Sequence, residues 1–248
     1  MKPLLVIKTG TKIPSLADYP GDYDHWIAQA MGWPLQNTMS VDVQAGDPLP
    51  EPGAVAGVAI TGSGSMVTEE LTWMVRTAAW LKDTVDQGVS VLGICFGHQL
   101  LAWSLGGEVG YNPRGIEVGT TSITLDDAAS TDPVFRGLPP RFPAQVSHSQ
   151  SVLSLPPGAV RLGWSDMDEH QGFRFGEHAW GLQFHPEFDQ EIVPHYVEYY
   201  RQELTRQQLG ADALLQDVTA TPESVRVLQQ FGQRVAGREQ KQQLTADD

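Results

Sequence analysis

The chain contains a single cysteine, Cys95, among its 248 residues. One cysteine cannot form a disulfide within the chain, which excludes a small scaffold held together by disulfides. A chain without disulfides fits a reducing compartment, so we expect a cytoplasmic protein.

Basic residues are also few, because 16 Lys and Arg stand against 30 Asp and Glu, a formal net charge of -14. A surface of this sign repels phosphate backbones, so we expect no nucleic-acid partner. An acidic balance is otherwise common for solubility alone and identifies no particular ligand.

Long apolar runs are lacking. No stretch approaches the roughly 18 consecutive apolar residues that a membrane-spanning helix needs. The apolar run near the N-terminus stops at Ile7 and is followed by Lys8 and Thr9, which is too short for the core of a signal peptide and predicts a first strand. We therefore expect no membrane contact.

Strands alternate with helices in the first half. Apolar runs at residues 4–7, 54–60 and 89–94 are typical of inner strands of a parallel sheet, and a further strand is expected at 34–43. The expected helices span residues 22–31, 68–88 with Thr68 as its cap, and 96–105. The apolar face of the second helix should comprise Leu71, Met74, Val75, Ala78, Leu81 and Val85.

Short strand-like segments dominate the second half. They lie at residues 118–125, 142–147, 159–164, 172–175 and 179–184, and a helix over 188–204 follows them. We predict an α/β fold of three layers, with a mostly parallel central sheet and flanking helices. Residues 1–205 would form the main domain, and residues 206–248 a helical extension ending in a frayed tail.

Cys95 lies in the sequence Gly-Ile-Cys-Phe-Gly, between a predicted buried strand and a predicted helix. This arrangement is the cysteine counterpart of a nucleophile elbow, in which a sharp turn lifts the reactive side chain above the edge of the sheet. The amino end of the helix favours the thiolate. A lone cysteine is more often a small core residue, so its partners must decide.

His185 and Glu187 supply such partners. His185 follows a predicted strand directly, at the carboxyl end where α/β sheets bind ligands. Pro186 ends the strand, so His185 can face the thiol while Glu187 turns back to orient the imidazole. Such a histidine takes the thiol proton and later protonates a leaving amine.

The loop Thr-Gly-Ser-Gly-Ser at residues 61–65 follows another strand. Its small residues allow backbone N–H groups to point at a developing oxyanion, although such loops also cradle phosphate. The loop does not match the P-loop pattern G-x-x-x-x-G-K-[ST], which disfavours nucleotide binding of that type.

With these motifs the chain resembles the class I glutamine amidotransferases, through GICFGHQ at 93–99 and WGLQFHPEF at 180–188. The GSGS loop and SHSQSV at 147–152 are weaker matches, and the resemblance spans about residues 4–205. It implies a flavodoxin-like fold and hydrolysis of the side-chain amide of glutamine through a γ-glutamyl thioester, with release of ammonia.

The resemblance implies a role for each matching residue. Cys95 would be the nucleophile, His185 the base and acid, and Glu187 its orienting partner. The oxyanion hole would comprise the backbone N–H of Phe96 and that of Ser63 or Gly62. The residues expected to contact substrate are Gln99, Ser147, Ser149 and Gln150.

The chain departs from the family pattern at two places. Gly62-Ser63-Gly64 replaces the common Gly-Gly-Pro loop, and Gln150 replaces an acid. Backbone groups serve in the first case, so only substrate specificity at Gln150 is put in doubt.

The remaining histidines lack metal-ligand spacing and are expected to be structural or exposed. We expect neither a metal nor a cofactor.

Three functions stay open from the sequence. The first is a glutaminase that passes ammonia to a separate synthase subunit, as in the branch similar to the amidotransferase part of GMP synthase. The second is a free-standing γ-glutamyl peptidase that acts on small γ-glutamyl peptides or conjugates. In either case the expected ligand is glutamine or another γ-glutamyl small molecule. The third, a non-catalytic binding module, is disfavoured because Cys95, His185 and Glu187 are all present.

Overall fold

The computed structural model describes residues 2–246, and their side chains as far as residue 241. Its strands are β1 Leu4–Lys8, β2 Thr38–Asp42, β3 Gly57–Ile60, β4 Ser90–Ile94, β5 Glu108–Tyr111, β6 Glu117–Leu125, β7 Arg141–His148, β8 Gln150–Ser154, β9 Ala159–Trp164, β10 Gly172–Phe175 and β11 Ala179–Leu182. Its α-helices are α1 Tyr23–Ala30, α2 Thr72–Asp86, α3 Phe96–Ser104, α4 Val193–Tyr199, α5 Arg201–Arg206, α6 Ala211–Gln216 and α7 Pro222–Ala246.

A nine-stranded sheet forms the centre of the molecule, in the order β2-β1-β3-β4-β11-β10-β9-β6-β7. The strands from β2 to β11 pair in parallel, and those beyond β11 pair antiparallel. Strands β5 and β8 form a separate two-stranded sheet. The predicted fold class is therefore confirmed, with a parallel centre extended by antiparallel strands.

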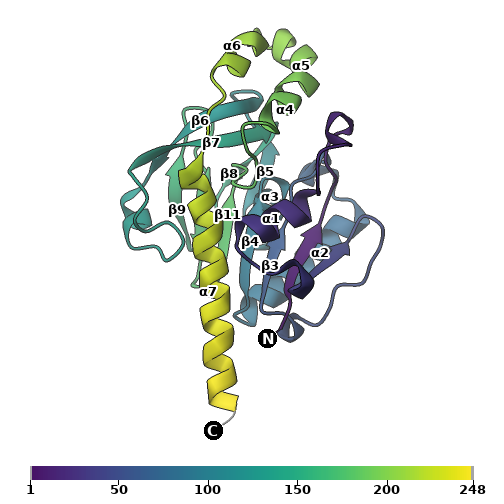
Figure 1. Ribbon diagram of the computed structural model, residues 1–248, viewed down its shortest axis with the longest axis vertical. Coiled ribbons are helices and arrows are strands. Elements are labelled where there is room, and N and C mark those ends of the chain that lie inside the picture. Colours follow the sequence, from purple (N-terminus) through teal and green to yellow (C-terminus); the bar gives the residue numbers. More distant parts are fainter. Residues whose placement is uncertain (1, 247–248) are drawn as a thin grey trace.

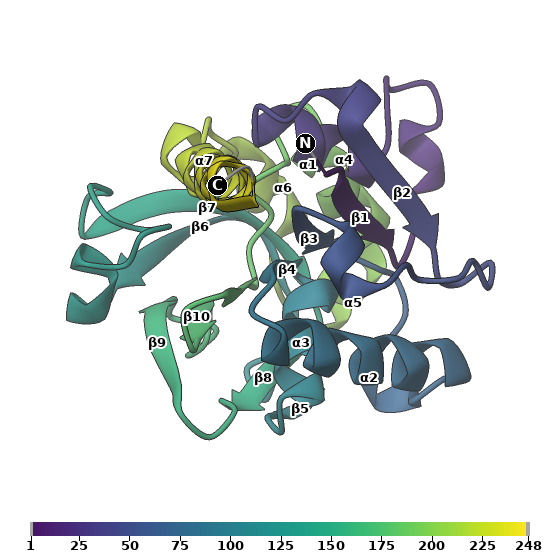
Figure 2. The ribbon, with the colours of Figure 1, turned by 90° about the horizontal axis from the view of Figure 1, so that it is seen from below.

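Helices cover both faces of the parallel strands (Figures 1 and 2). On one face, buried side chains of α1 and α7, such as Ile27 and Phe231, pack in one cluster with β1 and β11. On the other face, α2 and α3 contribute residues such as Leu81 and Leu100 to a second cluster. Each layer buries the apolar side of its neighbour, as three-layer folds require.

The helix predicted over residues 188–204 is wrong in its extent. The Asp189 carboxylate accepts hydrogen bonds from the backbone N–H groups of Glu191 (2.8 Å) and Ile192 (2.9 Å), which forms a turn in place of helix. Helix α4 starts only at Val193, and Tyr200 separates it from α5. The sequence between His185 and α4 is thereby left free to fold over the imidazole.

Helix α2 also differs from the prediction at its start. A 3₁₀ turn, Val67–Glu69, precedes it, and the N-cap is Leu71 rather than Thr68. The hydroxyl of Thr68 accepts a hydrogen bond from Gln150 Nε2 (2.6 Å). Of the predicted apolar face, Met74 and Leu81 are buried, but Leu71 and Val75 are 42% and 48% exposed.

Helix α7 packs on the main core, because Val227, Leu228, Phe231 and Val235 are fully buried in the cluster that includes the sheet. The helix extends to Ala246. Residues 247–248 of the predicted frayed tail lie outside the described residues. A domain boundary near residue 205 stays a prediction. Within residues 2–246, no helix is long and apolar enough to cross a membrane.

Candidate active site

Cys95 stands at the junction between β4 and α3, where the chain turns sharply. Its backbone has φ 52° and ψ -107°, a conformation that residues other than glycine rarely adopt. Such a conformation costs on the order of 1–3 kcal/mol and persists where its surroundings fix it. Here the Cys95 N–H donates to the Leu182 carbonyl (2.7 Å), which ties the turn to the next strand of the sheet.

The two glycines around Cys95 are required by close backbone contact. A Cβ on Gly93 would lie 2.3 Å from the Gly97 carbonyl oxygen, and one on Gly97 would lie 2.5 Å from that of Ile60. The helix can therefore start directly above β3 and β4 only because neither position carries a side chain. The turn that the sequence predicted is the one that the structure has.

Strand β11 lies beside β4 and brings His185 to the cysteine. Ile94 pairs with Leu182 in the parallel ladder, so the segments that follow both strands leave the sheet together. His185 Nδ1 donates to Glu187 Oε1 (2.8 Å), and the side chains of both residues are buried. The structure thus brings together Cys95, His185 and Glu187.

The imidazole of His185 is held in a charged state. Burial alone would lower its pKa, but the negative charges of Glu187 and Cys95 outweigh burial and raise the pKa to about 10. His185 therefore carries a proton at neutral pH, opposite the sulfur.

Aromatic rings fix the plane of this imidazole. Phe188 stacks on His185 with ring centroids 4.0 Å apart and 7° between the planes. Tyr196 and Tyr23 stack on Phe188 in turn, and their hydroxyl groups are hydrogen-bonded to each other. The aromatic segment at the start of α1 therefore supports the histidine through Phe188.

The loop after β3 lies against this pair. A Cβ on Gly62 would lie 3.0 Å from His185 Cε1 and 3.8 Å from Cys95 Cβ. The Gly62 carbonyl accepts hydrogen bonds from the hydroxyl groups of Thr9 (3.1 Å) and Thr61 (3.0 Å). Because the C=O and N–H of a trans peptide point in opposite directions, these bonds direct the Ser63 N–H away from Thr9.

The segment predicted to bind substrate lies on the other side of the thiol. Cys95 Sγ is 3.5 Å from the Ser147 carbonyl oxygen. Gln99 is buried, and its amide donates to the Gln150 carbonyl (2.7 Å) and to Gln183 Oε1 (3.0 Å). The structure therefore places Gln99 behind this segment, which it holds in position, whereas Phe96 begins α3 directly after the cysteine.

Gln150, which replaces the acid of the family pattern, is almost fully buried. Its Nε2 donates to Thr68 Oγ1 (2.6 Å), while its Oε1 has no hydrogen-bond partner among the described residues. A buried amide oxygen without a hydrogen-bond partner costs free energy, because it has lost its bonds to water. It is therefore an available acceptor at this position.

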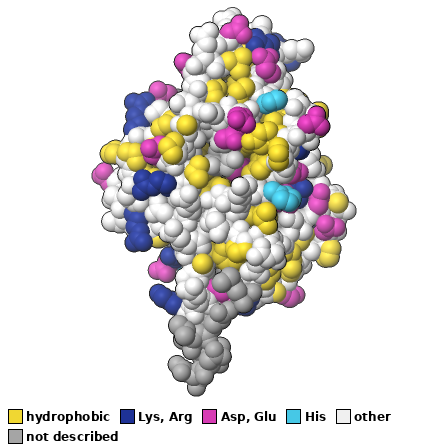
Figure 3. Space-filling model, in the orientation of Figure 1, with side chains coloured by type: hydrophobic (Ala, Val, Ile, Leu, Met, Phe, Trp, Pro, Cys, Tyr) yellow, Lys and Arg dark blue, Asp and Glu magenta, His cyan; other side chains and the backbone are white. Residues whose placement is uncertain are grey.

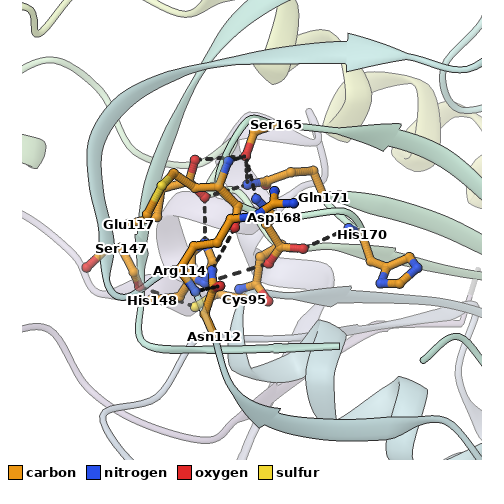
Figure 4. Close-up of polar contacts among 12 residues, drawn as sticks. Cys95, Asn112, Arg114, Glu117, Ser147, His148, Ser165, Asp168, His170 and Gln171 are labelled. Atoms are coloured by element: carbon orange, nitrogen blue, oxygen red, sulfur yellow. Dashed lines mark hydrogen bonds and ion pairs between the residues drawn. The ribbon is translucent and has the colours of Figure 1, made fainter. Parts of the chain in front are cut away.

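A buried charge cluster lies behind Ser147, drawn in Figure 4, and no motif in the sequence indicated it. His148 Nε2 donates to Glu117 Oε2 (2.9 Å), and His148 Nδ1 lies 3.9 Å from Asp168 Oδ2. Ser165 and Gln171 donate to the Glu117 carboxylate. These residues come from different strands and loops, so no spacing pattern could have joined them.

His148 must be doubly protonated. Its Nε2 faces a carboxylate and its Nδ1 faces the Gln150 carbonyl oxygen (2.9 Å), and both partners only accept hydrogen bonds. Burial would lower the pKa of His148, but the bonds and charges of Glu117 and Asp168 raise it to about 9. An imidazolium thus lies one residue from the carbonyl that contacts Cys95.

This charge predicts a pH-dependent stability. The raised pKa of His148 stabilises the folded state fully below its ordinary value near 6.5, and this stabilisation is lost as pH rises through about 9. Urea unfolding of the native protein should therefore show a loss over that interval to which His148 contributes on the order of 1–3 kcal/mol.

The double variant His148→Gln/Glu117→Gln lacks both charges, and its stability should fall less over the same interval. The raised pKa of His185 acts in the same direction in both proteins, so their difference isolates His148. Equal losses in the two proteins would contradict a charged His148.

Within the described residues, no group of three or more His, Cys, Asp or Glu side chains could hold a metal ion. The arrangement at Cys95 is suited to nucleophilic attack on a carbonyl followed by proton transfer. A thiol, a charged imidazole, a buried carboxylate and a Gly-Ser loop lie together at the ends of neighbouring strands.

Comparison with known proteins points in one direction. Residues 37–203 match the family model described as glutamine amidotransferase class-I. The γ-glutamyl peptidase 5 of Arabidopsis thaliana is 36% identical over 139 residues, which are 55% of this chain and 55% of that protein. A GMP synthase of Aeropyrum pernix is 33% identical over 176 residues, 69% of this chain and 32% of the synthase.

Solved structures agree in fold. A glutamine amidotransferase from Methylobacillus flagellatus is 25% identical with a TM-score of 0.74, covering 97% of this chain and 95% of that one. One from Thermotoga maritima is 23% identical with a TM-score of 0.73, covering 95% and 98%. The matched part of this chain spans about half the length of the first curated relatives.

Proposed function

This chain belongs to the class I glutamine amidotransferase family, and from this premise we propose that it is a cysteine-dependent hydrolase of γ-glutamyl amides. The observation that carries the proposal is the placement of His185 between Cys95 and Glu187, at the carboxyl ends of β4 and β11. Its family relatives include proteins named γ-glutamyl peptidase and GMP synthase, which fit an enzyme of this type.

The first half of the reaction forms a covalent bond. The Cys95 thiolate attacks the γ-carbonyl carbon of the substrate, and the carbonyl π electrons move to oxygen. The backbone N–H groups of Phe96 and Ser63 stabilise this oxyanion. As the carbon–nitrogen bond breaks, the His185 imidazolium donates its proton to the nitrogen, and ammonia or an amine leaves a γ-glutamyl thioester on Cys95.

The second half regenerates the enzyme. Neutral His185 takes a proton from water, and the resulting hydroxide attacks the thioester carbon. Collapse of the second tetrahedral intermediate expels the thiolate and releases glutamate. Glu187 keeps the imidazole in one orientation and tautomer in both halves, because it holds Nδ1.

A second candidate is a glutaminase subunit that supplies ammonia to a synthase. It is favoured by the similarity to the GMP synthase of Aeropyrum pernix, because the match covers 69% of this chain but only 32% of that synthase. Under this alternative the partner is a synthase subunit, and glutamine is the substrate.

A substrate comparison tests the proposal. The purified chain is given glutamine, a γ-glutamyl dipeptide or a glutathione S-conjugate, and released glutamate and ammonia are measured separately. Turnover of a γ-glutamyl peptide by the chain alone supports the free-standing hydrolase. Release of ammonia from glutamine only after a synthase subunit is added supports the second candidate, and no turnover in any mixture contradicts both.

A further inference from the structure

A hollow of about 630 Å³ opens beside the candidate active site. Three of its lining residues belong to segments that flank the thiol. Met66 follows the loop that begins at Gly62, and Ser149 comes two residues after Ser147, whose carbonyl contacts Cys95 Sγ. Tyr200, the third of these residues, lies between α4 and α5.

Electrostatics also link the hollow to the thiol. Burial and the negative charge of Cys95 raise the pKa of Tyr200 to about 12. Ile116, in another wall, belongs to the apolar cluster that contains Phe188, the ring stacked on His185. Several lining residues of the hollow therefore belong to the segments and the apolar cluster that surround Cys95 and His185.

The size of the hollow matters because it exceeds the space that the leaving group of glutamine requires. Ammonia, the leaving group of glutamine, occupies almost no space, whereas sites for drug-sized ligands measure about 300–1,000 Å³. A hollow of about 630 Å³ falls within that range. It can hold a leaving group much larger than ammonia.

The chemistry of the walls favours an aromatic group. Tyr111 and Tyr199 line the hollow and are 65% and 58% exposed. The rings of Tyr199 and Tyr200 meet edge to face with centroids 4.9 Å apart. Tyrosine faces of this kind bind other rings, because aromatic pairs gain about 0.5–1.5 kcal/mol beyond buried area.

The walls have little unpaired charge to offer. Arg206 Nη1 lies 2.8 Å from Glu203 Oε2, so the two lining charges neutralise each other. Asn112 is occupied, since its Nδ2 donates to the Met167 carbonyl and its Oδ1 accepts from the Arg114 N–H. Figure 3 likewise shows basic and acidic side chains side by side at the end formed by α4, α5 and α6.

We propose that this hollow is the leaving-group subsite of the enzyme and selects γ-glutamyl amides whose amine carries an aromatic side chain. γ-Glutamyl-phenylalanine represents the class. This inference rests on the proposed hydrolase function. The γ-glutamyl part would lie along Ser147–Gln150, and the scissile amide nitrogen would face His185, with the aromatic ring against Tyr111.

Kinetics with three substrates test the subsite. In the native protein, kcat/KM should be at least about tenfold higher for γ-glutamyl-phenylalanine than for γ-glutamyl-alanine or glutamine. Tyr111→Ala should lower kcat/KM for γ-glutamyl-phenylalanine by roughly five- to tenfold, mainly through KM, because the ring contact is present before and during reaction. The other two substrates should change by less than about twofold, and Tyr111→Phe should retain the preference.

Met39→Ala is the matched control, because Met39 is 39% exposed on the edge strand β2, outside the hollow. It should leave all three substrates unchanged. No preference in the native protein would overturn the subsite, and so would equal losses for the three substrates in Tyr111→Ala. The latter result would place Tyr111 at the γ-glutamyl part instead.

A binding measurement separates failure of the subsite from failure of the proposed function. Calorimetry with Cys95→Ala, which retains the hollow, should show tighter binding of γ-glutamyl-phenylalanine than of γ-glutamyl-alanine. If that preference is present without turnover in the native protein, the subsite stands and the hydrolase proposal falls. If turnover occurs without any preference in binding, the hydrolase proposal stands and the subsite falls.

Discussion

Cys95→Ala is expected to abolish hydrolysis of every γ-glutamyl substrate, by about a millionfold in kcat, the loss typical when a nucleophile of this kind is removed. The reason is chemical, because alanine cannot form the thioester. Cys95 is the only cysteine of the chain, so no neighbouring thiol can replace it. Glutamate release in a sensitive coupled assay measures the loss, and retained turnover would contradict the assigned nucleophile.

The same variant should remain folded. Cys95 is 5% exposed and belongs to the core cluster that includes the sheet, and its replacement removes a single heavy atom, at a cost of roughly 1 kcal/mol. The strain of the unusual φ of 52° should be the same in the variant, since cysteine and alanine both carry a Cβ. Cys95→Ser is the matched control, because it keeps the size of the side chain but does not ionise near neutral pH, and it should be equally inactive.

The second large effect is expected at His185 and Glu187, with a definite order. His185→Asn should cost nearly as much as loss of the nucleophile, because it removes the group that protonates the leaving nitrogen. Glu187→Gln should cost about 10⁴-fold in kcat, since it orients the imidazole without exchanging protons itself. A reversed order would contradict these roles.

The pH profile gives an independent readout for Glu187. Its carboxylate is one of the charges that raise the pKa of His185 to about 10. Removing that charge should lower the pKa of His185, so the alkaline limb of kcat/KM should shift to lower pH in Glu187→Gln. Glu191→Gln, which removes an exposed acid from the same segment, should leave both the rate and the profile unchanged.

Local patterns were sufficient to predict the strands of the sheet and the turn at Cys95. The apolar runs and the glycines act within a few residues, and the close contacts of Gly93 and Gly97 explain why that short motif permits one geometry. The residues after His185 were predicted less well. Phe188, Ile192 and Tyr196 have helical spacing, but Asp189 forms a turn, and Phe188 stacks on the imidazole instead.

The sequence by itself determined the fold class and the residue types that meet at Cys95, because both follow from short-range patterning and from a motif that glycine contacts constrain. Only the tertiary structure decided which other groups surround the residues at Cys95. The buried cluster of His148, Glu117 and Asp168 comes from separate elements, as do the walls of the hollow. These residues become neighbours only when the chain folds. Their positions along the sequence show no period or spacing from which the contacts could be predicted.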